Sequence, residues 1–135
     1  MNYLLDVNAL IALGLQEHEF HQRVSLWVHS SVIRSARELA TCSITELGFI
    51  RIVAQTPQYG VALSQARELL LELRKSSVVK ITFVADALDT SQLPSWVKSP
   101  KQTTDGHLLQ LAQANGLMLA TLDSRIPGAY LIPEN

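Results

Sequence analysis

Short apolar segments alternate with longer amphipathic ones along almost the whole chain, and this alternation limits the possible folds more than any other feature. The short segments have the length of buried strands, whereas the longer ones repeat apolar residues at helical intervals. Strands that alternate with helices predict a parallel sheet covered by helices on both faces. In such sheets ligands bind beyond the carboxyl ends of the strands, so polar residues at those ends are the first candidates for a functional site.

The pattern places each expected element within a narrow range of residues. We expect strands at residues 2–5, 39–41, 78–84, 117–121 and 129–132. We expect helices at residues 7–15, 17–30, 43–55, 61–73 and 104–115, with glycines at positions 14 and 116 as helix ends. Residues 93–100 contain prolines and are expected to form a loop inside a single α/β domain that spans residues 1–135.

Composition excludes several classes of protein. Hydrophobic residues make up 47% of the chain, enough to bury a core without disulfides, and the single cysteine, Cys42, is expected in that core. One thiol cannot form an intramolecular disulfide, which predicts a reducing, cytoplasmic location. No secretory signal is visible and no apolar run reaches the roughly 18 residues of a membrane helix. The net charge of −1 means that any contacts with RNA must be local or aided by a bound cation.

Four carboxylates lie next to the ends of expected elements, and each has a local structural explanation. Asp6 follows the first strand, where it can cap the next helix. Glu46 completes a capping box that begins at Ser43. Asp105 lies in the first turn of a helix that a threonine can cap, where it complements the helix dipole. Asp123 follows a strand, where an Asx-turn accounts for it.

The shared position of these four carboxylates points to a different role. Asp6, Glu46 and Asp105 lie at helix starts, and Asp6 and Asp123 lie just past strand ends, so a parallel sheet brings them to one edge. At ~4 Å and an effective dielectric constant near 20, each pair of like charges costs on the order of 4 kcal/mol. Either some of the carboxylates stay protonated or a cation compensates them. Oxygen ligands without a Cys or His cluster favour Mg²⁺ or Mn²⁺.

The same residues resemble the PIN-domain family, in particular the VapC-type toxins of bacterial toxin–antitoxin pairs. The likeness covers nearly the whole chain, and it depends on several segments in order rather than on any single motif. The segments are residues 4–13 (LLDVNALIAL), 18–27 (HEFHQRVSLW), 43–51 (SITELGFIR), 104–112 (TDGHLLQLA) and 119–123 (LATLD).

The resemblance implies a three-layer α/β sandwich with a mostly parallel sheet and a Mg²⁺- or Mn²⁺-dependent endoribonuclease that hydrolyses RNA. It also implies a cognate antitoxin protein and a homodimer. Residues 55–101 carry no motif of the family. One departure is Gly106, where the family commonly has alanine, and we expect it to loosen the helix start without affecting the metal ligands. Matched to the family in order, the catalytic and metal-binding acids are Asp6, Glu46, Asp105 and Asp123, and Thr121 is the small hydroxyl residue near the last acid.

Other residues are secondary candidates for the site. Asn8 lies beside Asp6, and Arg51 follows Glu46 by slightly more than one helical turn, so it can steady a carboxylate or contact phosphate. Metal-activated water requires no imidazole, so the four histidines are expected to be structural or exposed. Two alternatives remain open: a PIN-like RNA-processing or DNA nuclease outside toxin–antitoxin systems, and a non-catalytic binding module whose acids are all caps. Metal-dependent stabilisation separates the binding module from a nuclease.

Overall fold

A five-stranded, all-parallel sheet forms the centre of the computed structural model, which describes residues 2–75 and 78–134. The expected parallel sheet is confirmed, although each strand except the second is shorter than expected. The order across the sheet is β3-β2-β1-β4-β5. The strands are β1 (Tyr3–Leu5), β2 (Leu39–Thr41), β3 (Ile81–Phe83), β4 (Met118–Thr121) and β5 (Tyr130–Leu131).

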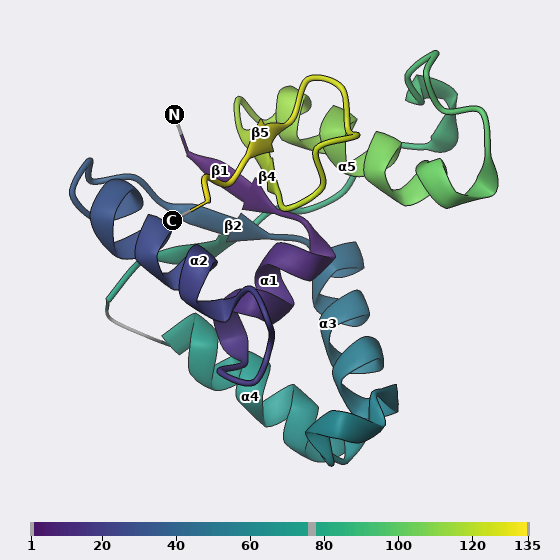
Figure 1. Ribbon diagram of the computed structural model, residues 1–135. Helices are drawn as coiled ribbons and strands as arrows, with labels where there is room; N and C mark the ends of the chain where they lie inside the picture. The colour runs from purple at the N-terminus through teal and green to yellow at the C-terminus, as the bar shows by residue number, and fades with distance from the viewer. Residues whose placement is uncertain (1, 76–77, 135) are drawn as a thin grey trace.

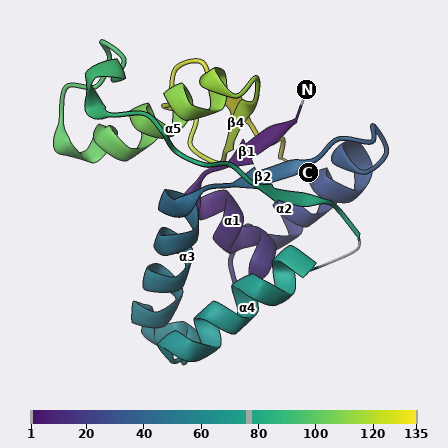
Figure 2. The same ribbon diagram turned by 180° about the vertical axis from the view of Figure 1, so that it is seen from behind.

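Helices cover both faces of this sheet, which confirms the three-layer sandwich (Figure 1). Alternate residues of one strand enter different cores: Leu5 packs with α1 to α4, and Leu4 packs with α5 on the opposite face. Figure 2 shows the same division from behind, with α3 and α4 extending away from the sheet. The helices are α1 (Val7–Gly14), α2 (His21–Trp27), α3 (Ser43–Gln55), α4 (Leu63–Lys75) and α5 (Thr103–Ala114).

The expected helix at residues 17–30 begins later than predicted, at His21. The preceding residues form turns that reverse the chain between α1 and α2, and the backbone N–H of Phe20 donates to Nδ1 of His18 at 3.0 Å. Nδ1 of His21 lies 2.7 Å from the carbonyl oxygen of Ala12, which fixes the start of α2 against α1. After Trp27 the helix continues as one π-helical turn, Val28–Val32.

Residues 84–102 connect β3 to α5 as an irregular segment with two short 3-10 turns, and the expected loop at residues 93–100 lies within it. Nε2 of His107 on α5 lies 2.6 Å from Oδ2 of Asp86 and ties this segment to the helix. Gly106 has a packing role that its sequence context did not indicate. A Cβ there would overlap with Cγ2 of Val97, so the glycine lets the segment pack directly on the start of α5.

Candidate acidic site at the carboxyl edge of the sheet

Asp6 lies immediately after β1 at the carboxyl edge of the sheet, and both of its oxygens are occupied. Oδ1 accepts a hydrogen bond from the backbone N–H of Ala9 at 2.9 Å, so the predicted N-cap of α1 is confirmed. Oδ2 accepts from Oγ1 of Thr121 at 2.5 Å. Only 6% of the surface of Asp6 is exposed. These bonds hold a buried carboxylate in one orientation at the end of the strand.

Thr121 connects Asp6 to the last of the four acids. It is buried at the end of β4, beside β1, and its Oγ1 also accepts the backbone N–H of Asp123 at 3.0 Å. Because one hydroxyl donates to Asp6 and accepts from the backbone of Asp123, it sets the positions of two acids from different strand ends. A small hydroxyl residue was predicted here, and its contact with the first acid is a result of the fold.

Asp123 forms the predicted Asx-turn and also an ion pair that the sequence analysis missed. Its Oδ1 accepts from the backbone N–H of Arg125 at 2.9 Å. The guanidinium of Arg125 contacts both carboxylate oxygens, with Nε to Oδ1 at 2.9 Å and Nη2 to Oδ2 at 3.1 Å. These hydrogen bonds and the positive charge of Arg125 lower the pKa of Asp123. A basic residue two positions after a turn-forming Asp was the signal that could have indicated this pair.

The pKa values show that Asp6, Asp105 and Asp123 influence one another. Burial raises the pKa of Asp6 from 3.8 to about 6, and the charges of Asp105 and Asp123 add to this rise, while its two hydrogen bonds oppose it. Burial and the charge of Asp123 also raise the pKa of Asp105, which lies in the first turn of α5 as predicted. Burial and neighbouring negative charge therefore destabilise the ionised forms of Asp6 and Asp105, and a divalent cation would relieve the repulsion between these carboxylates.

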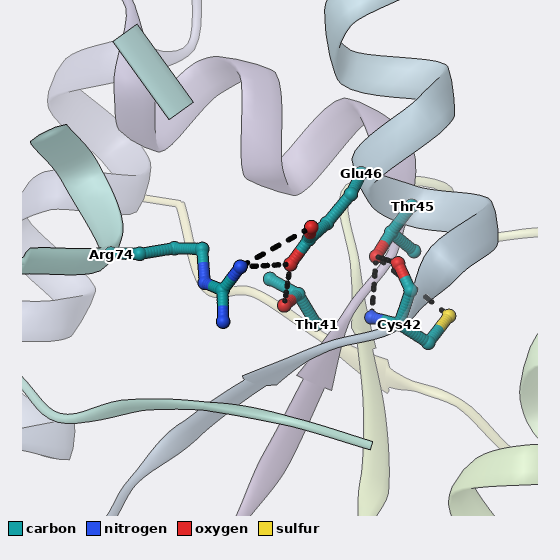
Figure 3. Close-up of polar contacts among 5 residues, drawn as sticks. All are labelled: Thr41, Cys42, Thr45, Glu46 and Arg74. Atoms are coloured by element: carbon teal, nitrogen blue, oxygen red, sulfur yellow. Dashed lines mark hydrogen bonds and ion pairs between the residues drawn. The ribbon is translucent and has the colours of Figure 1, made fainter. Parts of the chain in front are cut away.

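Glu46 has partners of its own, the side chains of Thr41 and Arg74 (Figure 3). The predicted capping box from Ser43 to Glu46 was wrong, because Cys42 is the N-cap of α3 and Thr45 completes the box. The carboxylate of Glu46 instead accepts from Oγ1 of Thr41 at 2.6 Å and pairs with Nη1 of Arg74 at 3.4 Å. The predicted N-cap, Ser43, lies one residue too late in the sequence. Cys42 keeps an extended backbone after β2 and is itself the N-cap.

The alternation of side chains along the strands explains this separation. Leu39 packs with α1 to α4 and Ala40 with α5, so the next residue of β2, Thr41, returns to the face of α1 to α4. By the same rule Thr121, after Leu119 and Ala120 of β4, points to the face of α5, and its hydroxyl contacts Asp6. Within residues 2–75 and 78–134, no three His, Cys, Asp or Glu side chains are arranged so that they could hold a metal ion together.

Two cavities meet at Asp123 and Arg125. The larger, of about 460 Å³, also contains Asp6, the exposed Asn8 and His18 in its walls. The smaller, of about 230 Å³, is lined by Asp105 together with Trp96 and Lys101.

Arg51 lies elsewhere, exposed on α3 in the wall of a mostly apolar cavity of about 700 Å³ that contains none of the four acids. Arg74, which no sequence pattern indicated, is the arginine that pairs with Glu46.

The donors around Asp6 are all oxygens, the type of ligand that a hard divalent cation prefers, although no three acids of the described residues converge on one point. Asp6 and Asp105 supply carboxylate oxygens without an ion pair in the described part of the chain, and the neighbouring donors are the oxygens of Thr121 and Asp123. Oxygen ligands of this kind suit Mg²⁺ or Mn²⁺, which retain several waters and need few ligands from the protein.

Nearly the full length of the chain is similar to known PIN-domain proteins. The family model described as PIN domain matches residues 3–130. Ribonuclease VapC44 of Mycobacterium tuberculosis is 36% identical over 138 residues, which cover 96% of this chain and 94% of that protein. Ribonuclease VapC38 of the same organism is 37% identical over 128 residues, which cover 91% of this chain and 86% of that protein.

A solved structure shares the fold. The crystal structure of Mycobacterium tuberculosis VapC20, described as a Sarcin-Ricin loop cleaving toxin, superposes with a TM-score of 0.66 and covers 98% of this chain and 100% of that one. The sequences are 14% identical, so this likeness concerns the arrangement of the sheet and helices.

Proposed function

The chain belongs to the PIN-domain family, and from this premise we propose that it is a metal-dependent endoribonuclease, the toxin of a toxin–antitoxin pair. The observation that carries the proposal is the acidic site at the carboxyl edge of the sheet, where the charges of Asp105 and Asp123 raise the pKa of Asp6 and the charge of Asp123 raises the pKa of Asp105. The curated relatives named ribonucleases support RNA as the substrate.

Asp6 and Asp105 are proposed as the main ligands of Mg²⁺ or Mn²⁺, with Asp123 and Glu46 acting directly or through water. When bound, the cation supplies two things: it lowers the pKa of a water molecule and it neutralises charge on the scissile phosphate. The chain's own residues prepare the site for this chemistry. The N–H of Ala9 and the hydroxyl of Thr121 orient the Asp6 carboxylate before any ligand arrives, so little reorganisation is needed.

RNA would reach the acids through the two cavities that meet at Asp123 and Arg125. The guanidinium of Arg125 is exposed in the walls of both, and Lys101 lies in the wall of the smaller one. Both can contact phosphate oxygens, which gives the local positive charge that a chain with net charge −1 otherwise lacks. The exposed side chain of Phe20 lines the larger cavity and offers a surface for a base to stack on.

An RNA cleavage assay tests this proposal. We expect the purified protein to cut oligoribonucleotides only with Mg²⁺ or Mn²⁺, and we expect Asp105→Asn to lower the rate at least about 100-fold, because the ligand loses its charge. Asp89→Asn is the matched control, since it removes the same charge from an exposed residue outside the site. Equal cleavage by Asp105→Asn and the control would contradict the assignment of Asp105, and cleavage of DNA instead of RNA would favour the alternative nuclease.

A cognate antitoxin and a homodimer complete the proposed function. Exposed leucines on α3 and α4 support the presence of partner surfaces: Leu47 is 62% exposed and Leu63 is 56% exposed, and both line the apolar cavity of about 700 Å³. Expression of the chain alone should arrest growth, and a small protein encoded beside it should restore growth and copurify with it. A chain that is harmless when expressed, yet cleaves RNA when purified, would point to RNA processing instead.

A further inference from the structure

One wall of the larger cavity, of about 460 Å³, comes from the turn between α1 and α2. His18 and Phe20 both line the cavity from this turn. Backbone hydrogen bonds hold the turn in place: the carbonyl oxygen of His18 accepts the N–H of His21 at 3.0 Å, and that of Phe20 accepts the N–H of Val24 at 3.1 Å. The wall is therefore formed before any ligand binds, which lowers the entropic cost of binding.

The imidazole of His18 is held as a neutral hydrogen-bond donor. Its Nδ1 accepts the backbone N–H of Phe20 at 3.0 Å, so this nitrogen carries no proton and the proton of the neutral ring lies on Nε2. Partial burial lowers the pKa of His18, which keeps the ring neutral near pH 7. Among the described residues Nε2 has no hydrogen-bond partner, so it remains available to donate to a ligand in the cavity.

The phenyl ring of Phe20 gives the same wall an apolar surface, and 38% of this residue is exposed. The ring centroids of His18 and Phe20 lie 5.9 Å apart, and the guanidinium carbon of Arg23 lies 5.8 Å from the centroid of Phe20, so both neighbours steady the ring. Asn8, exposed in the first turn of α1, adds an amide to the cavity. The cavity thus combines a flat apolar surface with hydrogen-bonding groups.

These groups suit a flat, neutral ligand with polar edges rather than a phosphate. The cavity volume lies within the roughly 300–1,000 Å³ of sites that hold small ligands. The exposed carboxylate of Glu19 adds negative charge beside His18 and repels phosphate. Phosphate is attracted instead to the guanidinium of Arg125 in the same cavity, and a nucleotide bound there would place its base toward Phe20.

We propose that this wall is a nucleobase subsite, in which an unpaired base of the RNA stacks on Phe20 and accepts a hydrogen bond from Nε2 of His18. The inference builds on the proposed function, because it takes RNA as the ligand of the cavity beside Asp6. A base reaches the subsite only when it is unstacked from its neighbours, so the site selects single strands and loops over duplexes. His18 and Phe20 are thereby specificity-determining residues.

RNA probes with and without bases test the subsite. The protein carries Asp105→Asn so that the RNA stays intact, and fluorescence anisotropy compares its binding to a labelled adenylate decamer and to an abasic decamer with the same sugar–phosphate backbone. Phe20→Ala should weaken binding of the adenylate decamer about tenfold, because base–aromatic stacking is lost, and should leave binding of the abasic decamer unchanged. Phe20→Tyr keeps an aromatic ring and should retain the affinity.

His18→Asn separates the hydrogen bond to the base from the structure of the turn. Asparagine still accepts the backbone N–H two residues later, as in an Asx-turn, so the turn is kept. Its side chain is too short to replace Nε2, so binding of the adenylate decamer should weaken about threefold and binding of the abasic decamer should not change. Phe83→Ala is the matched control, because Phe83 is 46% exposed and lines neither of the two cavities.

Equal losses on the two decamers, unchanged binding of the adenylate decamer by Phe20→Ala, or an equal loss in Phe83→Ala would overturn the inference. Metal-dependent RNA cleavage by the protein with Asp105 intact would still leave the proposed function standing. A loss in Phe20→Ala that depends on the base, in a protein that cleaves no RNA, would support the subsite and overturn the nuclease.

Discussion

Asp6 shows at the scale of one residue how a structural role and a functional one can coincide. Its carboxylate caps α1 and accepts the hydroxyl of Thr121, so its position is fixed by two hydrogen bonds. Its burial near two other acids makes the ionised form costly, and its pKa rises to about 6. A cap that only stabilised a helix would be better placed in water, where its charge is well solvated.

Asp6→Asn should therefore stabilise the metal-free protein near neutral pH. The folded-state pKa of about 6 exceeds the ordinary value of 3.8, so the folded protein binds this proton more tightly than the unfolded chain does. Stability should fall as pH rises from about 4 to about 6 and remain lower above that, by up to about 3 kcal/mol. Asparagine keeps the acceptor for Ala9 without the charge. Urea unfolding across this pH range should show the fall in the wild type and a smaller one in the variant.

When Mg²⁺ is added, the effect of Asp6→Asn on stability should be the reverse of its effect on the metal-free protein. The wild type should gain thermal stability with Mg²⁺ near pH 7.5, and Asp6→Asn should gain little, because a ligand has been lost. A variant that is less stable than the wild type without metal and equally stabilised by Mg²⁺ would mean that Asp6 is a helix cap alone.

At the scale of elements, α5 and the segment before it form one wall of the acidic site. Residues 84–102 are held against α5 by the contact between His107 and Asp86 and by the close approach of Val97 to Gly106. Asp105 precedes Gly106 directly, so the packing of this segment determines where the third acid lies. Trp96 and Lys101 come from the same segment and line the smaller cavity.

Gly106→Ala should displace the segment of residues 84–102 from the start of α5. The added methyl group would overlap with Cγ2 of Val97, and the strain should cost about 1–3 kcal/mol, more than the helix gains from alanine. We expect a lower melting temperature and slower RNA cleavage. In the double variant Gly106→Ala with Val97→Ala, most of the loss should be recovered because space is restored. A single variant as stable and active as the wild type would show that the segment adapts without moving Asp105.

At the scale of the whole molecule, charge is arranged locally rather than over a broad surface. The net charge is −1, and among the described residues the arginine and lysine side chains in the walls of the two cavities are Arg125 and Lys101. Bulk attraction therefore contributes little to RNA binding, and specificity must come from the site and the segments around it. No helix in the described residues is long and apolar enough to cross a membrane.

RNA binding should consequently depend only weakly on salt. With about two phosphate contacts on a single strand, the slope of log K against log salt concentration should be roughly −1.4. The measurement is fluorescence anisotropy of a labelled oligoribonucleotide with the inactive Asp105→Asn variant over a range of KCl. A slope steeper than about −4 would reveal a wider basic surface than these residues provide.

Much of the fold follows from the sequence by itself. Short apolar segments and helical patterns identified the strands and helices, and the parallel sheet followed from their alternation. Four acids were expected at one edge because the ends of parallel strands and the starts of the helices after them share that edge. Asp6, Asp105 and Asp123 influence one another there, whereas Glu46 pairs with Arg74. The start of α2 was predicted wrongly, since the turns before His21 depend on contacts with α1 that no local pattern encodes.

Only the tertiary structure decided which charges are paired. Glu46 turns to Arg74, 28 residues away, and Thr121 meets Asp6 across 115 positions. Sequence spacing had suggested Arg51 beside Glu46 and gave no indication of Arg74. Periodicity determines which face of a strand or helix a residue occupies, whereas ion pairs depend on distances between side chains brought together by packing. The local pattern therefore located the acids, and the packing of α4, β2 and the turn after β4 determined which of them pair with an arginine.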